Sequence, residues 1–322
     1  MNYLKSLDSY FHLYQEKRDG LNLIYTNINF SGIPLGNFIE SLIVRNFQAQ
    51  DSVVLVASHP KCGTTWLKSL TFALLNRHRF PPSNKNHPLL TKNSHQLVPS
   101  LEVRVDPNNP IHDIISVPAD TSLMRFICSH LPYVSLPKSC QDSGCKIVYI
   151  CRNPKDTFVY LWHHMNKLRI YNKRAIGLEE ASDMFCRGVT MMGPFWDHVL
   201  SYWKESLERP GKVLFLKYEE IREQPEFQVR RTAEFIWCPF SSTEDEAGSG
   251  SGVVDEIVRL CCFEHLSNLE VNKSGKTTTG LEFNVISRRP QVDDWKNYLT
   301  PEMADRFDHI TKEKFHGFGL EL

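Results

Sequence analysis

Residues 53–76 combine a strand-like run, a tight loop and a helical pattern, and they constrain the fold more than any other part of the chain. The mostly β-branched run Val53–Ala57 has the length of a buried strand, and apolar positions between Thr64 and Asn76 recur at helical spacing. The loop between them contains Pro60 and Gly63. A strand that turns directly into a helix is typical of α/β folds.

Further apolar strands alternate with helical patterns along the chain. We expect strands at Lys146–Ile150 and Val213–Lys217, and helices at about 154–168, 194–207, 226–235, 253–269 and 300–314. Asn153 and Thr300 are suited to cap helices that begin with Pro154 and Pro301. This alternation predicts one α/β domain over residues 35–322, with a central parallel sheet flanked by helices, after an N-terminal segment, 1–34, that lacks a clear pattern.

Composition excludes several classes of function. The 322 residues include 37 Lys+Arg and 37 Asp+Glu, so the net charge is zero and general binding to nucleic acid or a membrane surface is not expected. Nine cysteines without a C-x-x-C pair predict neither a zinc site nor a redox pair. The start, Met1–Ser9, does not read as a signal peptide, and no apolar run is long enough to cross a bilayer. We therefore expect a cytoplasmic protein without a metal.

The loop after the first strand is suited to binding an anion. A helix N-terminus presents unpaired N–H groups and the positive end of the helix dipole, which together attract phosphate or sulfate. Lys61 adds a charge, Thr64 and Thr65 add hydroxyls, and Gly63 permits close backbone approach. Lys61 precedes the glycine, so the loop is not a Walker A motif. The shape alone is equally compatible with a corner that binds nothing.

Two further basic corners suggest a ligand with more than one anionic group. Arg152 and Lys155 flank a predicted helix start, and Arg288 and Arg289 precede Trp295. Each alone is explained as readily by solvated basic side chains. Together with Lys61 they favour a nucleotide that is phosphorylated at both ends.

His130 is the histidine best placed for chemistry. It lies just past the apolar stretch 124–128, after Ser129, and an imidazole, with a pKa of about 6.5, can act as a general base. For any lone histidine a structural role is the ordinary alternative. His163 and His164 are adjacent, so on a helix they point in different directions and are not expected to share a metal.

In their order along the chain, these motifs resemble the cytosolic sulfotransferase family, and its plant branch in particular, over roughly residues 35–322. Residues 60–68 (PKCGTTWLK) are similar to the family's PKSGTTWLK loop, and 152–159 (RNPKDTFV) are similar to its 3′-phosphate-binding motif. Residues 294–302 (DWKNYLTPE) are typical of the plant enzymes. The fold that this implies is one α/β domain with a P-loop-like phosphosulfate-binding loop.

The resemblance implies a co-substrate, 3′-phosphoadenylyl sulfate, and a reaction that needs no metal. His130 falls at the position of the family's catalytic base. Lys61 would stabilise the charge that develops on the departing nucleotide, as positioned cations do in phosphoryl transfer. The resemblance also assigns a set of nucleotide contacts: Lys61, Cys62, Gly63, Thr64, Thr65, Trp66, Arg152, Tyr160, Tyr218, Phe263, Arg288, Arg289 and Pro290.

Three departures from the family pattern fall on the expected 3′-phosphate site. Tyr160 replaces a serine, and its ring would need space that the phosphate normally takes. Pro290 replaces the glycine of an RKG triplet and removes an N–H donor. Asp293 replaces another glycine, which would add a carboxylate and remove conformational freedom. These changes predict altered donor affinity rather than altered chemistry.

The partner implied by the resemblance is a small, largely apolar molecule that offers a hydroxyl, of the flavonoid, steroid or hormone type. Residues 296–305 match the family's dimerisation element only in part, which leaves a monomer or a weak homodimer. The alternative is a non-catalytic or weakly active nucleotide-binding relative, motivated by the three departures. A P-loop kinase is disfavoured by the order of Lys61 and Gly63.

Overall fold

The computed structural model describes residues 47–101, 125–169, 175–190, 192–242, 244, 252–275 and 291–322. The N-terminal segment 1–34 and the basic triplet Arg288, Arg289 and Pro290 lie outside these residues, so the expectations for them stand as predictions. Within the described ranges, no helix is both long enough and apolar enough to span a membrane.

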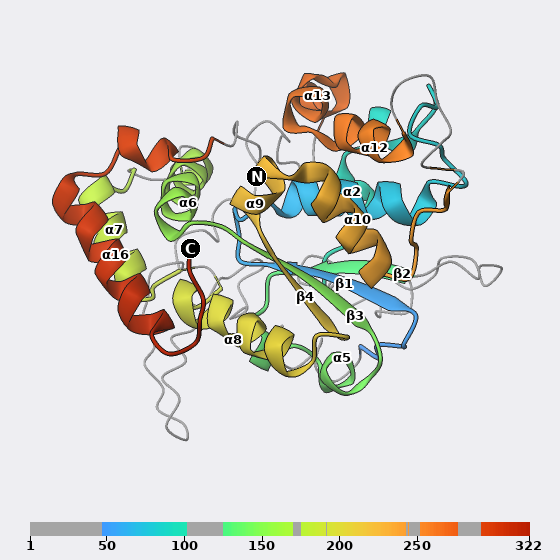
Figure 1. The fold of residues 1–322 in the computed structure, drawn as a ribbon. Helices are drawn as coiled ribbons and strands as arrows, with labels where there is room; N and C mark the ends of the chain where they lie inside the picture. Colours follow the sequence, from blue (N-terminus) through green and yellow to red (C-terminus); the bar gives the residue numbers. More distant parts are fainter. Residues whose placement is uncertain are drawn as a thin grey trace, which may run out of the picture.

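A parallel four-stranded sheet forms the centre of the molecule (Figure 1). Its strands are β1 (Val53–Ser58), β2 (Arg125–Ser129), β3 (Lys146–Cys151) and β4 (Val213–Lys217), arranged in the order β2-β1-β3-β4. The register pairs Ala57 with Ser129 and with Tyr149 on the two sides of β1. The expected α/β fold with a parallel sheet is confirmed.

Helices connect the strands and continue beyond them. The longer ones are α2 (Thr64–Asn76), α6 (Pro154–Arg169), α7 (Leu178–Cys186), α8 (Phe195–Glu208), α10 (Pro225–Phe235), α12 (Val253–Cys261) and α16 (Pro301–Phe315). The short ones are α3 (Ser94–Leu97), α5 (Lys138–Asp142), α9 (Tyr218–Glu223), α13 (Phe263–Asn268) and α14 (Glu270–Ser274), with 3₁₀ turns η2 (Pro88–Leu90), η3 (Tyr133–Ser135) and η4 (Asp294–Asn297).

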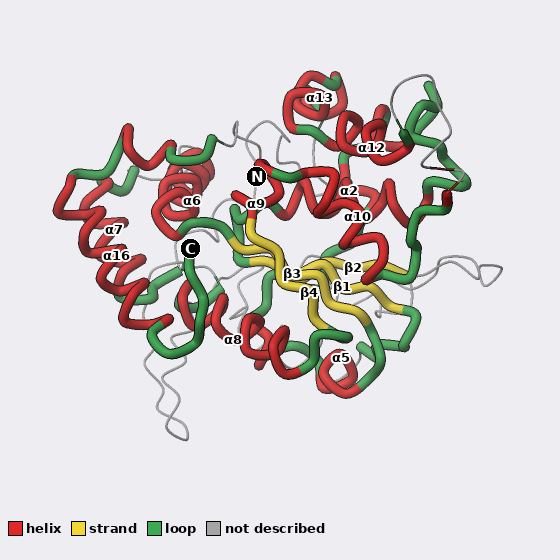
Figure 2. The backbone as a smooth tube through the Cα atoms, in the orientation of Figure 1, coloured by secondary structure: helices red, strands yellow, loops and turns green. Residues whose placement is uncertain are grey.

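Helices cover both faces of the sheet, which lies between them in Figures 1 and 2. Successive strand residues point to opposite faces. Leu55 and Tyr149 therefore enter one buried cluster, which includes residues of α8 and α16, whereas Val54 and Val148 enter another, which includes residues of α2, α10 and α12. Burial on both faces explains why these strands are continuously apolar.

Two helix starts have the side-chain caps expected from the sequence, and one expected helix is divided in two. The Asn153 side chain accepts the Lys155 N–H at 2.9 Å, and Thr300 Oγ1 accepts the Met303 N–H at 3.3 Å, so both predicted caps are confirmed. The single helix expected at 253–269 is wrong. Cys262 adopts an extended conformation (φ −64°, ψ 149°) and its Sγ accepts the His265 N–H, so it ends α12 and caps α13.

The carboxyl ends of the four strands meet at one edge of the sheet. The segments that follow them carry Lys61 after β1, His130 after β2, Arg152 after β3 and Tyr218 after β4. Open parallel sheets bind ligands at this edge, where neighbouring connections leave in opposite directions. The topology thus brings together residues that are up to 157 positions apart (218 − 61).

Candidate active site

The β1–α2 loop presents an uncapped helix N-terminus. The first hydrogen bond within the helix runs from the Leu67 N–H to the Gly63 carbonyl, and no side chain caps the helix. The N–H groups of residues 63–66 therefore have no partner in the helix. Gly63 has φ +113°, and a Cβ there would lie 3.0 Å from the Ile150 side chain and 3.1 Å from Tyr218, so only glycine fits without strain.

Lys61 lies in this loop in a left-handed backbone conformation, with φ 72°. Burial, together with the charge of Lys167, lowers the pKa of Lys61 to about 7. The ammonium is thus only partly formed near neutral pH. A bound anion would favour the charged form and raise that pKa.

Cys62, which was expected to contact the nucleotide, turns its side chain away from the cavity. Its Sγ lies 3.5 Å from Thr157 Oγ1, and the thiol is fully buried. Burial raises the pKa of the thiol to about 12, so it stays protonated. Cys62 therefore packs the loop against α6 and has only backbone atoms to offer to an anion.

His130 is oriented by the end of β1. Its Nδ1 donates to the Ser58 carbonyl oxygen at 2.8 Å, and the Ser58 hydroxyl lies 3.4 Å from the same nitrogen. His198 Nε2 donates to the His130 carbonyl at 3.0 Å and holds the backbone. Since a carbonyl oxygen only accepts, Nδ1 carries the proton of the neutral ring and Nε2 carries the lone pair. This is the tautomer that a general base requires.

Arg152 is almost completely buried, with 1 % of its surface exposed. Its guanidinium donates to Asp156 Oδ2 at 3.2 Å and to the Gln291 carbonyl at 2.5 Å. The guanidinium carbon lies 4.4 Å from the centre of the Tyr160 ring and 4.6 Å from that of Tyr218. Its Nε atom is buried without a hydrogen-bond partner among the described residues, so one donor of the guanidinium is unsatisfied.

Tyr160 and Asp293, two of the residues that depart from the family pattern, make different contacts. Tyr160 Oη accepts the Gln291 N–H at 2.8 Å, beside Arg152. Asp293 adopts the left-handed conformation expected of glycine, with φ 66°, which aspartate tolerates better than most residues. Its carboxylate pairs with Lys296 at 2.5 Å and is about half exposed. The expectation that Asp293 lacks the needed conformational freedom is therefore wrong.

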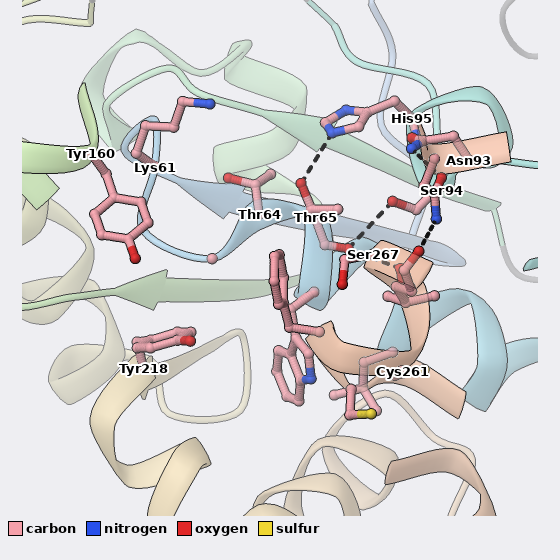
Figure 3. Close-up of a pocket in the computed structure, with 18 of the residues that line it drawn as sticks. Lys61, Thr64, Thr65, Asn93, Ser94, His95, Tyr160, Tyr218, Cys261 and Ser267 are labelled. Atoms are coloured by element: carbon pink, nitrogen blue, oxygen red, sulfur yellow. Dashed lines mark hydrogen bonds between the residues drawn. The ribbon is translucent and has the colours of Figure 1, made fainter. Parts of the chain in front are cut away.

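One cavity of about 450 Å³ collects most of the predicted site (Figure 3). Among the described residues that line it, none is Asp or Glu, whereas Lys and Arg occur six times. A carboxylate-free, cation-rich cavity attracts an anionic ligand. The predicted site residues that it includes are Lys61, Gly63, Thr64, Thr65, Trp66, His130, Arg152, Tyr160, Tyr218 and Phe263.

The cavity is also lined by residues that were not predicted from the sequence to belong to the site. Asn93, Ser94 and His95 of the α3 turn line it opposite Tyr160 and Tyr218, as Figure 3 shows. His163 and His164, considered only as metal ligands, both line it as well. Within the part of the chain that the structure describes, no group of three or more metal-ligating side chains is present. No local pattern marks His95, because its partners come from another element.

Comparison with known proteins identifies the protein family. Residues 51–319 match the model of the sulfotransferase domain. Cytosolic sulfotransferase 5 of Arabidopsis thaliana is 47 % identical over 278 residues, covering 86 % of this chain and 84 % of that protein, and cytosolic sulfotransferase 12 is 46 % identical over 279 residues, covering 86 % and 82 %. The crystal structure of an Arabidopsis thaliana protein described as a putative steroid sulphotransferase is 37 % identical, with a TM-score of 0.69, over 97 % of this chain and 93 % of that one.

The chain therefore belongs to the sulfotransferase family and is a transferase that depends on 3′-phosphoadenylyl sulfate. A mouse sulfotransferase in complex with PAP (adenosine 3′,5′-bisphosphate) shares the fold, with a TM-score of 0.64 at 22 % identity, over 93 % of this chain and 94 % of that one. The resemblance inferred from the motifs is confirmed.

Proposed function

We propose that this protein transfers a sulfuryl group from 3′-phosphoadenylyl sulfate to the hydroxyl of a small, largely apolar acceptor in the cytoplasm. The observation that carries this proposal is the cavity at the carboxyl edge of the sheet. There, a base-competent His130 and a buried Lys61 share one carboxylate-free space with the uncapped N-terminus of α2.

The residues present fit the donor. The N–H groups at the start of α2, with Lys61, suit the 5′-phosphosulfate. Arg152, whose guanidinium lies beside the Tyr160 and Tyr218 rings and whose Nε has no partner among the described residues, suits the 3′-phosphate. Trp66 and Phe263 offer aromatic faces for the base. From the sequence alone, we propose that Arg288, Arg289 and Pro290 also contact the 3′-phosphate.

The chain's own groups have distinct roles in the transfer. The bound donor supplies the sulfuryl group and a nucleotide leaving group. His130 Nε2 accepts the proton of the acceptor hydroxyl, while the Ser58 carbonyl holds Nδ1–H in place. Lys61 and the α2 N–H groups stabilise the negative charge that develops on the leaving oxygen.

The acceptor class is proposed from what two related structures are described as binding or acting on. We propose an acceptor of the flavonoid, steroid or hormone type, because a relative is described as a putative steroid sulphotransferase. A retinol dehydratase of the same fold, with a TM-score of 0.70 at 19 % identity, holds androsterone beside PAP. Since Thr300 of the partial dimerisation match caps α16 and Lys296 pairs with Asp293, we also propose a monomer or weak homodimer.

A second candidate is a relative that binds the nucleotide but transfers slowly or not at all. It is favoured by Tyr160, which engages both the Arg152 guanidinium and the Gln291 N–H where the family has a serine. Calorimetric titration with adenosine 3′,5′-bisphosphate, AMP and ATP separates the candidates, followed by an acceptor screen with 3′-phosphoadenylyl sulfate. Micromolar binding that requires the 3′-phosphate, with turnover, supports the enzyme. Binding without turnover on any acceptor supports the second candidate, and failure to bind the bisphosphate contradicts both.

A further inference from the structure

Lys68 and His95 form a buried contact behind the anion loop. Lys68, on the second turn of α2, is 2 % exposed. Its Nζ lies 3.2 Å from His95 Nδ1 and 3.3 Å from the Val98 carbonyl oxygen. An ammonium group has only donors, so His95 Nδ1 must accept.

That contact determines which nitrogen of His95 carries the proton. Burial, followed by the charges of Lys68 and Lys61, lowers the pKa of His95 well below its usual value, so the ring is neutral. With Nδ1 accepting, the single proton is on Nε2. This nitrogen lies 3.1 Å from Thr65 Oγ1 and donates to it, the contact drawn as a dashed line in Figure 3.

The chain of donors ends at Thr65, which lines the cavity. Because Thr65 Oγ1 accepts from His95, the hydroxyl proton is directed elsewhere, and Thr65 is too near the start of α2 for a helical carbonyl to take it. Thr64 differs, because its hydroxyl lies 2.6 Å from Ser58 Oγ and either group can be the donor. At Thr65 the direction of the hydroxyl is set by the His95 N–H that it accepts.

We propose that His95, oriented by Lys68, is a positioning residue that makes the Thr65 hydroxyl a dedicated hydrogen-bond donor to the anionic 5′ end of the nucleotide. This inference rests on the proposed function, since it takes the anion at the α2 N-terminus to be that 5′ group. An anionic oxygen only accepts, so a hydroxyl that already points its proton into the site has no rotational freedom to lose on binding. The charge of Lys68 thereby acts on the ligand through an ordered pair of hydrogen bonds.

The test compares two ligands, adenosine 3′,5′-bisphosphate and adenosine 3′-monophosphate, which lacks the 5′ group. The variants are His95→Met, His95→Gln, Thr65→Val and the double variant His95→Met/Thr65→Val. Thr65→Val loses a hydrogen bond to a charged group and should weaken bisphosphate binding by about ten- to hundred-fold. His95→Met keeps the hydroxyl but no longer directs its proton, so it should weaken binding by a smaller factor, about three- to tenfold. The double variant should be no weaker than Thr65→Val alone. His95→Gln, whose amide can donate to Thr65, should recover most of the affinity.

The monophosphate distinguishes positioning from a general loss of structure. Its affinity should be the same in all variants within about twofold, because it makes no contact with Thr65. His87→Met is the matched control, since it removes another buried histidine, which caps η2 and does not line the cavity. This control should leave both affinities unchanged.

Two results would overturn the inference while leaving the proposed function intact. One is a loss of bisphosphate affinity in the double variant that equals the product of the two single losses. The other is an equal loss of affinity for the bisphosphate and for the monophosphate. If the wild-type protein fails to bind the bisphosphate at all, the proposed function itself fails.

Discussion

The carbonyl oxygen of Ser58 lies 2.8 Å from His130 Nδ1, so the last residue of β1 fixes the tautomer of the residue that follows β2. The two strands are neighbours in the sheet, with Ala57 paired to Ser129. The orientation of the proposed base is thus a property of strand pairing. It does not require the acceptor to be present.

Replacing His130 by alanine should lower kcat by at least about a hundred-fold, because the acceptor hydroxyl loses its proton acceptor. Binding of adenosine 3′,5′-bisphosphate should stay within about twofold, since that ligand carries no acceptor hydroxyl to deprotonate. Steady-state kinetics and calorimetry measure the two quantities. His78→Ala is the control, because the His78 side chain is 77 % exposed. Turnover retained in the His130 variant would remove this residue from its role.

Binding of the bisphosphate should weaken as the pH rises through about 7, the pKa of buried Lys61. Below that pH Lys61 is already charged; above it, the anion must bind together with a proton. Affinity should fall roughly tenfold between pH 6.5 and 8, and calorimetry in buffers of different ionisation enthalpy should show proton uptake.

Lys61→Arg provides the comparison for this pH dependence, because arginine stays charged throughout the range. The variant retains only the titration of the ligand phosphate. Identical pH profiles for the wild type and Lys61→Arg would show that Lys61 is fully charged in the ligand-free protein.

Gly63→Ala should both destabilise the protein and impair donor binding. A Cβ at φ +113° is strained and lies 3.0 Å from Ile150, so a loss of about 1–3 kcal/mol in the free energy of unfolding is expected. Relief of this strain would displace the N–H groups of the β1–α2 loop, which are proposed to bind the donor. Gly211→Ala, where a Cβ meets nothing within 4 Å, should change stability by no more than about 0.5 kcal/mol. Thermal unfolding and bisphosphate titration of both variants test this, and equal behaviour would contradict it.

Tyr160→Ser should tighten binding of the bisphosphate several-fold and raise kcat/KM for the donor. The substitution removes the ring that stacks on Arg152 and opens space beside the guanidinium. Tyr160→Phe keeps the ring but removes the acceptor of the part-buried Gln291 N–H, which should cost about 0.5–1.5 kcal/mol of stability without improving affinity. If Tyr160→Ser binds more weakly than the wild type, the tyrosine is itself a productive contact to the donor.

Local chemistry explains which parts of the fold were predictable. The buried strands, α2 and the Asn153 and Thr300 caps depend on neighbouring residues, and the periodicity and cap residues record them directly. The helices α7 and α5 were not anticipated from the sequence, and the division at Cys262 depends on a thiol acting as a cap, which is an uncommon acceptor.

The site was predictable where a motif was continuous and unpredictable where tertiary contacts decide. The loop around Gly63 and the Arg152 corner each lie within a few residues of sequence. His95 is different, because its proposed role depends on Lys68 and Thr65, which belong to α2 and contact it only in the folded chain. Asp293 shows the opposite limit: it stands where the family pattern has glycine, yet it adopts the left-handed backbone conformation that glycine adopts freely.

Each of the four strands delivers one site residue at its carboxyl end, from Lys61 to Tyr218. A ribosome must therefore have synthesised and released more than two thirds of the chain before the last of these residues can dock. A partly synthesised chain, or one truncated before β4, lacks a complete site.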